Sequence, residues 1–438
     1  MKKFALTVGA LLLVGTMVFA GGSSEAGSTK NTGSLHTTID KPVTIEFWHS
    51  FSGTQVPVLE GLVTQFNETV GKEKGITVTP VAQGSGPQLY SKVIGAIKAG
   101  NAPAVTASKP PYVQDFIMAD YVIDLKPYIE DPTVGMKDYD DFFKVFREES
   151  EAYSVPGIYS LPFAKNADVL YYNADFFQEH GLIPPKTWED MEVLGQKIHD
   201  ITGKGAFGYD NVQYLFENLV KQYGGEYTDK EGNLLFAQSD AALEGLDMYA
   251  ENVWKGIWRT VGEDGFFSGP FARGTIQMYI GGTVESQYIN MKNPEFTWSA
   301  VPIPQKDLNN RFTLSYDHVI CALNPKASPD VQYAAYEFIK FITSTEASKA
   351  ITLGTSYMTV RESVLSDAEY KAYTESGKND ALKAATAQKD FLYFQPVFIA
   401  DTYTSSTVDN EITSMMKRVL DNKEDPKAAI ASVISTLK

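Results

Sequence analysis

The sequence predicts an α/β protein with a mainly parallel sheet, because strand and helix patterns alternate along the chain. Apolar and polar residues alternate over 43–49, which is typical of a strand, and an amphipathic helical pattern follows directly. A second strand and a second helix repeat this order up to residue 100. The chain has 438 residues, of which 43% are hydrophobic, so it is long enough for two domains with sizeable cores.

The first elements are predicted from their apolar positions and from the residues that end them. Val43, Ile45 and Phe47 share one face of the first strand, and Gly53 ends that segment. A second strand is expected over 75–81. The apolar stripes of the two helices are Leu59, Leu62, Val63 and Phe66, and then Leu89, Val93, Ile94 and Ile97.

Later helices are predicted from their capping residues. Thr187 and Asp190 have the spacing of a capping box, and Gly203 ends the helix that follows. Pro329 and Pro426 each follow a capping residue, as expected at the first position of a helix. No repeat with a period of about 20–50 residues occurs, which excludes a solenoid or a propeller.

The N-terminus has the pattern of an export signal. Two lysines precede a short apolar run over 4–19, and a small-x-small pattern ends at Ala20. We therefore predict a cleavable signal peptide over 1–20, with an uncleaved anchor as the alternative. Gly21 stands where a lipoprotein carries cysteine. Residues 21–42 are expected to form a flexible leader, and the mature protein is expected in the periplasm or outside the cell.

Charge and cysteine content restrict the partners and the chemistry. The formal net charge of −16 disfavours nucleic acid and anionic lipid as partners. Cys321 is the single cysteine, so it has no partner for a disulfide within the chain. Its apolar neighbours predict a buried structural thiol rather than a nucleophile.

The sequence lacks the common motifs of catalysis and metal binding. None of the five histidines is paired with another at metal-ligand spacing, and neither a G-x-S-x-G elbow nor a P-loop occurs. We therefore predict no metal and no cofactor. Carboxylates are abundant, so a pair of them acting in glycoside hydrolysis stays open, and a secreted carbohydrate-active hydrolase is the alternative function.

Six short motifs occur in a fixed order along the chain. They are Phe47-Trp48-His49-Ser50, Ala99-Gly100-Asn101-Ala102-Pro103, Leu161-Pro162-Phe163 leading to Val169-Leu170-Tyr171-Tyr172-Asn173, Pro185-Lys186-Thr187-Trp188-Glu189-Asp190, Gly274-Thr275-Ile276-Gln277-Met278, and Gly354-Thr355-Ser356-Tyr357-Met358-Thr359-Val360-Arg361. As a set, they resemble the extracellular solute-binding proteins (family 1) of ABC importers, in particular the sugar-binding and glycerol-3-phosphate-binding members.

This resemblance implies a two-lobed periplasmic-binding-protein type II fold with a hinge and an interlobe cleft. Lobe one is expected over 43–163 plus 304–352, and lobe two over 168–303 plus 357–438. The implied function is capture of a sugar, oligosaccharide or polyol and its delivery to the permease subunits of an ABC importer, by a monomer without enzymatic activity. A ligand-sensing component of a chemoreceptor with the same fold is a further alternative.

Ligand-binding residues are predicted from loop positions and from the resemblance. A sugar packs its C–H faces on aromatic rings and needs donors and acceptors for its hydroxyls. Ser50 and Ser52 follow the first strand, and the Gly-rich loop with Ser85 and Gln88 is either a ligand loop or a plain turn. The resemblance adds Lys109, Tyr112, Asn166, Asp168, Tyr209, Tyr214, Gly282, Thr283 and Tyr357. Asp317, in a turn predicted over 316–318 before the strand that holds Cys321, is a further candidate as an acceptor for two hydroxyls or a cation.

One departure from the resembled family concerns the ligand. Phosphate-binding members carry an arginine in the C-terminal segment, and Val397 occupies that place here. Asp168, Glu285 and Asp317 are candidate acids of the cleft, although Glu285 is also compatible with a position facing solvent. A neutral sugar or polyol is therefore expected rather than glycerol 3-phosphate, with an amino sugar as an alternative.

Overall fold

The computed structural model describes residues 35–377, 379–398, 400 and 402–437. The predicted signal peptide lies outside these residues, as does the predicted leader up to residue 34. The leader residues that follow contact α13 (Pro329–Ile342). His36 Nε2 lies 2.7 Å from Asp330 Oδ1, and the backbone N–H of Asp40 donates to the same carboxylate at 3.3 Å. This last part of the leader is therefore hydrogen-bonded to a helix.

The strands form a sheet with the order β2-β1-β3-β7-β4-β5, and β6 also pairs with β4 while β8 pairs with β7. Their bounds are β1 (Val43–His49), β2 (Ile76–Ala82), β3 (Val105–Ser108), β4 (Leu161–Asn173), β5 (Met278–Gly282), β6 (Trp298–Pro302), β7 (Thr313–Ala322) and β8 (Leu392–Tyr393). The pairs β1–β2 and β1–β3 are parallel as predicted, whereas β7, β4, β5 and β6 join through antiparallel pairs.

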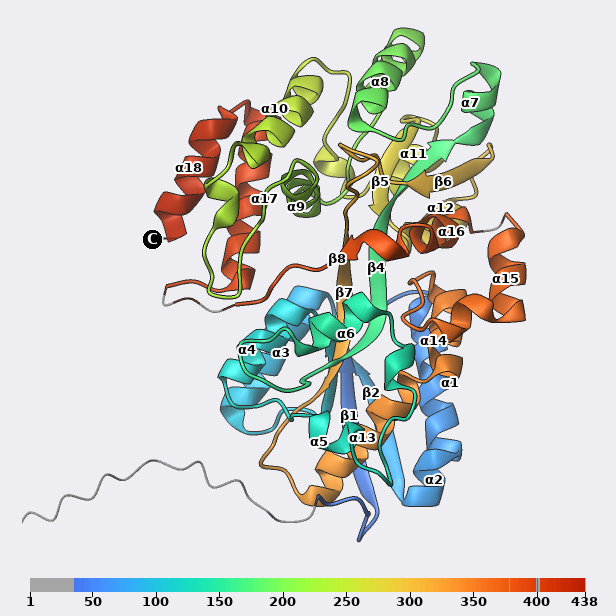
Figure 1. Ribbon diagram of the computed structural model, residues 1–438. Coiled ribbons are helices and arrows are strands. Elements are labelled where there is room, and N and C mark those ends of the chain that lie inside the picture. Colours follow the sequence, from blue (N-terminus) through green and yellow to red (C-terminus); the bar gives the residue numbers. More distant parts are fainter. Residues whose placement is uncertain (1–34, 378, 399, 401, 438) are drawn as a thin grey trace, which may run out of the picture. The chain divides into compact units, whose positions relative to one another are not determined.

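Two long strands, β7 and β4, connect the part of the sheet that contains β1–β3 with the part that contains β5 and β6. The N-terminal part of β4 pairs with β7, and from Asp168 onward β4 pairs with β5 and β6 instead (Figure 1). The predicted change of lobe between 163 and 168 therefore falls inside β4. Strand β4 is buried almost throughout, since elements from both parts of the sheet pack against it. The lobe boundaries themselves stay a prediction.

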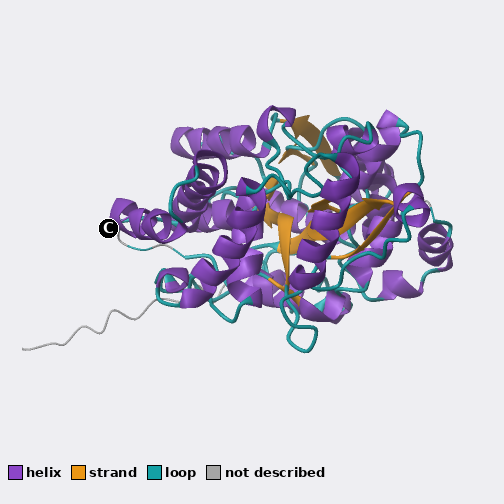
Figure 2. Ribbon diagram, turned by 90° about the horizontal axis from the view of Figure 1, so that it is seen from above, coloured by secondary structure: helices purple, strands orange, loops and turns teal. Residues whose placement is uncertain are grey.

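Helices surround the strands (Figure 2). Besides α13, they are α1 (Gln55–Glu68), α2 (Val70–Lys74), α3 (Gly86–Ala99), α4 (Pro110–Met118), α5 (Lys126–Ile129), α6 (Lys144–Glu151), α7 (Ala174–Glu179), α8 (Trp188–Thr202), α9 (Val212–Gln222), α10 (Asp240–Trp254), α11 (Ser268–Ala272), α12 (Glu285–Lys292), α14 (Thr345–Thr355), α15 (Ala368–Glu375), α16 (Asp380–Thr386), α17 (Ser405–Asn422) and α18 (Pro426–Leu437). Within the described residues, none of them combines the length and apolar character that a membrane span requires.

The predicted caps and stripes explain where several helices begin and which face they bury. The capping box of α8 is confirmed, because Thr187 Oγ1 accepts from the Asp190 N–H at 3.0 Å and the Asp190 carboxylate accepts from the Thr187 N–H at 3.1 Å. Gly203 ends this helix with φ 64°, a left-handed conformation that glycine adopts without strain. The four stripe residues predicted for α1 are all buried.

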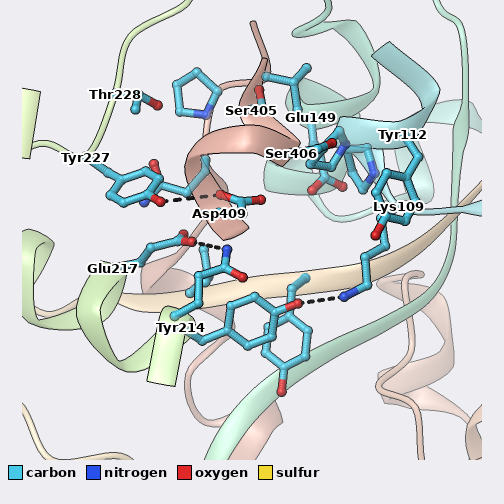
Figure 3. A pocket seen from close by; sticks show the side chains of 18 of the residues that line it. Lys109, Tyr112, Glu149, Tyr214, Glu217, Tyr227, Thr228, Ser405, Ser406 and Asp409 are labelled. Carbon is cyan, nitrogen blue, oxygen red and sulfur yellow. Dashed lines mark hydrogen bonds between the residues drawn. The ribbon is translucent and has the colours of Figure 1, made fainter. Parts of the chain in front are cut away.

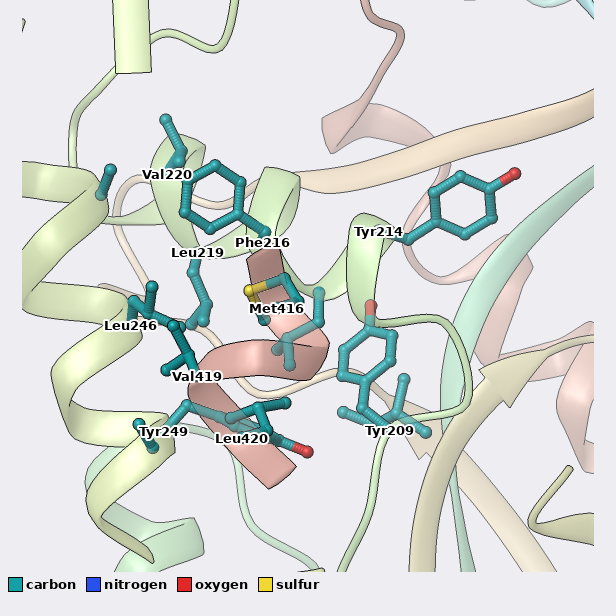
Figure 4. Packing of buried hydrophobic residues seen from close by; sticks show 14 of the residues in the cluster. Tyr209, Tyr214, Phe216, Leu219, Val220, Leu246, Tyr249, Met416, Val419 and Leu420 are labelled. Atoms are coloured by element: carbon teal, nitrogen blue, oxygen red, sulfur yellow. The ribbon is translucent and has the colours of Figure 1, made fainter. Parts of the chain in front are cut away.

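Hydrophobic clusters lie on both sides of the long strands. One cluster packs α9 and α10 against α17, with Phe216, Leu246 and Met416 fully buried at its centre (Figure 4). Another contains Cys321, which is also fully buried. Burial raises the pKa of the Cys321 thiol above its usual value, because desolvation penalises the thiolate. The prediction of a structural thiol is thus consistent with its surroundings.

The segment Tyr316–His318 differs from its prediction as a turn. It lies inside β7, which continues through it, and the backbone of Asp317 alone turns to φ 76°. For a residue with a side chain this left-handed conformation costs about 1 kcal/mol, and aspartate tolerates it better than most residues. The strain falls at the point where β7 faces Lys165 and Asn166 of β4.

Candidate functional site

A cleft opens where the ends of β1, β3 and β5 meet the central parts of β4 and β7. It encloses about 1690 Å³, part of it open to solvent. Nine of the predicted ligand-binding residues line it, namely Ser50, Ser52, Lys109, Asn166, Asp168, Tyr214, Gly282, Asp317 and Tyr357. They come from distant parts of the sequence, and the pairing of β4 with β7 and β5 brings them together.

Asn166 connects three strands at the floor of the cleft. Its side-chain oxygen accepts from both the backbone N–H and the hydroxyl of Thr283, each at 2.7 Å. Its amide nitrogen donates to Asp317 Oδ2 at 3.2 Å. Because these hydrogen bonds use the polar groups of Thr283, which is fully buried, Thr283 supports the floor of the cleft and does not line it.

Asp168 is held by two tyrosines. Its carboxylate accepts from the hydroxyl of Tyr209 at 2.5 Å and from that of Tyr316 at 2.6 Å. Burial raises the pKa of Asp168 to about 6, although the two hydrogen bonds oppose the shift. Tyr209 was predicted as a ligand residue, but its ring is buried and its hydroxyl is committed to Asp168, so it acts from behind the cleft.

Lys109 and Tyr214 separate the cleft from a second cavity. Lys109 Nζ donates to the hydroxyl of Tyr214 at 2.9 Å and lies 3.9 Å from Asp317 Oδ1. The ring of Tyr214 packs on that of Tyr316, with centroids 4.1 Å apart. These four side chains line both spaces, so they form a partition between them.

We call the second cavity the acidic chamber. It encloses about 860 Å³, part of it open, and its walls include Tyr112, Glu217, Tyr227 and Asp409 (Figure 3). The predicted ligand residue Tyr112 belongs to this chamber rather than to the cleft, and its ring stacks on Tyr90 at 4.3 Å. The carboxylates of α9 and α17 had no recognisable signal in the sequence, because they lie on helices rather than on loops.

The other predicted loop reaches the cleft with Gly86 and Pro87, and not with the polar residues Ser85 and Gln88. Ser85 and Gln88 form a capping box for α3, in which the Ser85 N–H donates to Gln88 Oε1 at 2.8 Å. The residues of this loop that line the cleft are Gly86 and Pro87. The side chains of Ser85 and Gln88 are thus committed to the helix cap, and the choice between a ligand loop and a plain turn stays open.

Gly282 is required by close packing at the end of β5. A Cβ atom built there would lie 2.4 Å from Asn166 Nδ2 and 2.7 Å from the hydroxyl of Tyr316. Neither atom belongs to a freely moving side chain, since both take part in the hydrogen bonds described above. Any side chain at this position would therefore displace the floor of the cleft.

His318 is a cleft residue that the sequence did not indicate. Its Nε2 lies 3.2 Å from the hydroxyl oxygen of Ser50, and its ring meets that of Tyr357 edge to face at 5.9 Å. Burial lowers the pKa of His318 to about 4, so the ring is neutral at physiological pH. A neutral imidazole offers one donor and one acceptor, which suits a hydroxyl group.

The buried Glu285 and the partly buried Asp210 form an interacting acid pair at one side of the cleft. Glu285 is 8% exposed, so the alternative of a solvent-facing side chain is wrong. Neither Asp210 Oδ2 nor Glu285 Oε2 has a hydrogen-bond partner among the described residues. Burial raises the pKa of Glu285 to about 7, and burial together with the Glu285 charge raises the pKa of Asp210. The cleft is therefore rich in acceptors.

The raised pKa of Glu285 predicts a pH-dependent contribution to stability. The folded state holds a proton that the unfolded state releases near its ordinary pKa of 4.5, so the stabilisation is complete at low pH and is lost as pH rises through about 7. We expect the stability of the wild type relative to Glu285→Gln to fall by on the order of 1–3 kcal/mol between pH 5 and pH 8. Urea unfolding at both pH values measures it.

The control for this prediction is Glu263→Gln, since Glu263 is exposed. Its stability relative to the wild type should not depend on pH. The charged neighbours of Glu285 are Asp210, whose pKa the Glu285 charge raises, and Lys292, which lowers the pKa of Glu285. A difference between wild type and Glu285→Gln that stays constant with pH would show that Glu285 is ionised throughout.

One group of side chains has the composition of a metal site. The ligand atoms of His36, Asp40 and Asp330 lie within 4.8 Å of one another, and no second such group occurs among the described residues. His36 and Asp330 are hydrogen-bonded to each other at 2.7 Å. None of the three lines the cleft or the acidic chamber.

Comparison with known proteins identifies a family. The family model described as "Bacterial extracellular solute-binding protein" matches residues 61–378, which is most of the chain. The match includes the strands and loops that form the cleft floor, from β2 through β7 and on to Tyr357.

Curated relatives match part of the chain. The sn-glycerol-3-phosphate-binding periplasmic protein UgpB of Escherichia coli K12 is 30% identical over 218 residues, which cover 46% of this chain and 45% of that protein. UgpB of Agrobacterium fabrum is 28% identical over 208 residues, covering 43% and 44%. The chain thus spans about half the length of the curated relatives it matches.

Solved structures share the fold over nearly the whole chain. UgpB from Mycobacterium tuberculosis in complex with glycerophosphocholine has a TM-score of 0.78 at 19% identity, covering 90% of this chain and 97% of that one. The cyclic α-maltosyl-1,6-maltose binding protein from Arthrobacter globiformis has a TM-score of 0.75 at 18% identity, covering 90% and 98%. These similarities confirm the predicted two-lobed α/β fold.

Proposed function

Because this chain belongs to the family of bacterial extracellular solute-binding proteins, we propose that it is the solute-binding component of an ABC importer. It captures a small hydroxylated solute in the cleft and delivers it to the permease subunits in the membrane. The observation that carries this proposal is the cleft itself, whose walls come from elements on both sides of the long strands β4 and β7.

The composition of the cleft supports a hydroxylated solute. Ser50, Ser52 and His318 offer groups that exchange hydrogen bonds with hydroxyls, while Tyr214 and Tyr357 offer ring surface for C–H faces. Lys109, Arg273 and Lys292 are the cations among the described lining residues, and Asp168, Asp210, Asp264, Glu285 and Asp317 outnumber them. A neutral sugar or polyol, or an amino sugar, fits this balance better than a dianionic phosphate ester.

The site is proposed to bind without catalysis. Asp168 accepts from two tyrosine hydroxyls, and Asp317 accepts from Asn166. Asp264 is ion-paired with Arg259 and Arg273, and Glu285 interacts with a second acid, Asp210. A hydrolase would instead turn the solute over. Absence of turnover of the bound compound therefore separates the two functions.

Titration with a defined panel tests the proposal. Calorimetry and thermal unfolding are carried out with D-glucose, maltose, D-sorbitol, glycerol 3-phosphate and glycerophosphocholine. We expect at least one compound to bind and to raise the midpoint of thermal unfolding. At one hundred times its Kd, the compound should raise the free energy of unfolding by about 2.7 kcal/mol, and it should itself stay chemically unchanged. Failure of all five to bind, or steady conversion of any of them, contradicts the proposal.

A variant pair locates the binding in the cleft. Asp317→Asn keeps a side chain that tolerates the left-handed backbone but removes the charge that accepts hydrogen bonds from the solute. We expect it to weaken the binding of the same panel compound at least tenfold, which is about 1.4 kcal/mol. The matched control is Asp390→Asn, because Asp390 is exposed and outside both cavities. Equal affinities of the two variants would place the solute elsewhere.

The N-terminal segment is proposed to be a cleavable export signal over 1–20 that leaves no lipid anchor. The family is extracellular, which supports export of this chain. Mass spectrometry of the protein released from its native host tests the position of cleavage. A mature chain that begins at Gly21 is expected, and an intact or lipid-modified N-terminus contradicts this assignment.

A further inference from the structure

The acidic chamber contains two carboxylates without a cationic partner. Glu217 of α9 is 2% exposed, and Asp409 of α17 faces the same space. Among the described residues, neither forms an ion pair within 4.0 Å. The charge of Lys109, at the edge of the chamber, lowers the pKa of both carboxylates, but its ammonium group is hydrogen-bonded to Tyr214 and lies 3.9 Å from Asp317 Oδ1.

Neutral groups hold these two carboxylates in place. Gln213 Nε2 donates to Glu217 Oε1 at 2.6 Å, and the hydroxyl of Tyr227 donates to Asp409 Oδ1 at 3.3 Å (Figure 3). Burial raises the pKa of Asp409 to about 7, and burial together with the Asp409 charge raises the pKa of Glu217. Asp409 is partly buried and its charge acts on the buried Glu217, so ionising both carries a cost that a cation placed between them offsets.

The walls of the chamber also suit an organic cation. Tyr227 is 3% exposed, and its ring lies beside the carboxylates; aromatic faces attract ammonium groups. Thr228 is 4% exposed and lines the chamber, yet its hydroxyl oxygen has no hydrogen-bond partner among the described residues. A buried hydroxyl of this kind is an acceptor that a solute N–H or O–H would satisfy.

Resting on the proposed function, we infer that the solute of this protein carries an organic ammonium group, which binds in the acidic chamber between Glu217, Asp409 and Tyr227. For the hydroxylated part of the solute to reach the cleft, the hydrogen bond between Lys109 and Tyr214 has to open, since these two side chains separate the two spaces. A primary ammonium supplies three N–H donors to the two carboxylates and Thr228, whereas a quaternary ammonium packs on the tyrosine ring.

Two matched pairs of compounds test the inference on the wild-type protein. D-glucosamine is compared with D-glucose, and glycerophosphocholine with glycerol 3-phosphate, by calorimetry at pH 7. In each pair only the first compound carries an ammonium group, which is primary in one pair and quaternary in the other. We expect the ammonium compound of at least one pair to bind at least tenfold more tightly, and the pair that shows the preference identifies the kind of ammonium.

Variants then assign the preference to the chamber. Glu217→Gln and Asp409→Asn keep the shape of each side chain, and their combination should remove the preference, with a loss of affinity of at least tenfold for the ammonium compound only. Glu263→Gln, at an exposed position, should retain it. The melting temperature of each free variant at pH 8 should equal or exceed that of the wild type, because one of the two like charges that face each other across the chamber is removed.

The outcomes separate this inference from the function on which it rests. Equal or tighter binding of D-glucose and glycerol 3-phosphate than of their ammonium partners overturns the inference and leaves the proposed function standing. Retention of the preference in the double variant also overturns it. Absence of binding by all four compounds and by the neutral panel overturns both.

Discussion

Replacing Asn166 with alanine is expected to lower the free energy of unfolding by about 3–5 kcal/mol and to abolish solute binding. The amide of Asn166 satisfies the backbone N–H and the hydroxyl of Thr283 and one oxygen of Asp317. Alanine leaves all three groups unpaired beneath the cleft, and it removes a side chain that is 2% exposed. Each orphaned buried group costs about 1–3 kcal/mol, so the sum is large even after partial relaxation.

Urea unfolding and calorimetry on the same preparation measure the two effects of Asn166→Ala. The matched control is Asn309→Ala, because Asn309 is exposed and hydrogen-bonds only within its own turn. We expect the control to change stability by less than about 0.5 kcal/mol. A loss below about 1 kcal/mol in Asn166→Ala would mean that water replaces the amide, and that the three strands do not depend on it.

Replacing Arg361 with methionine is expected to lower the free energy of unfolding by about 3–5 kcal/mol without a direct effect on the cleft. The guanidinium is fully buried and donates to the Thr343 carbonyl at 2.7 and 2.9 Å, and to the carbonyl and carboxylate of Asp138 at 2.7 and 2.9 Å. It also stacks on Phe142, 3.7 Å from the ring centroid. Methionine keeps the volume but leaves two carbonyls unpaired.

The control for Arg361→Met is Arg311→Met, since Arg311 is exposed and contacts a single ring, that of Phe391. We expect it to cost less than about 1 kcal/mol. Solute affinity of the folded fraction of Arg361→Met should match the wild type, because Arg361 does not line either cavity. A cost as small as that of the control would show that the buried guanidinium is no better paired than a surface one.

Many elements of the fold could be predicted from the sequence, because the patterns that indicate them are local. The alternation over 43–49, the buried stripe of α1 and the capping box at Thr187 each depend on neighbours within a few positions, and the structure has each of these elements. The antiparallel pairing of β7 and β4 could not be predicted from the sequence. It depends on contacts between segments far apart in the chain, which no local periodicity encodes.

Part of the candidate site could be predicted from the sequence for a similar reason. Loop residues such as Ser50 and Lys109 follow strand ends, so position alone indicates them. The sequence could not show that the hydroxyl groups of Tyr209 and Thr283 donate hydrogen bonds to other side chains, since those partners are set by packing. Glu217 and Asp409 could not be predicted, because a carboxylate on a helix normally faces solvent, and only the assembled helices turn these two toward a shared chamber.

The place of β7 in the sheet has a consequence for how the chain acquires its structure. Ala107 of β3 pairs with Ile320 of β7, so the sheet that begins with the first strand is completed only when a much later segment arrives. Such non-local pairing slows folding, because loop-closure entropy is lost before the contacts form. The chain therefore cannot complete this sheet until most of it has been synthesised. An incompletely folded chain is compatible with passage through a narrow translocation channel.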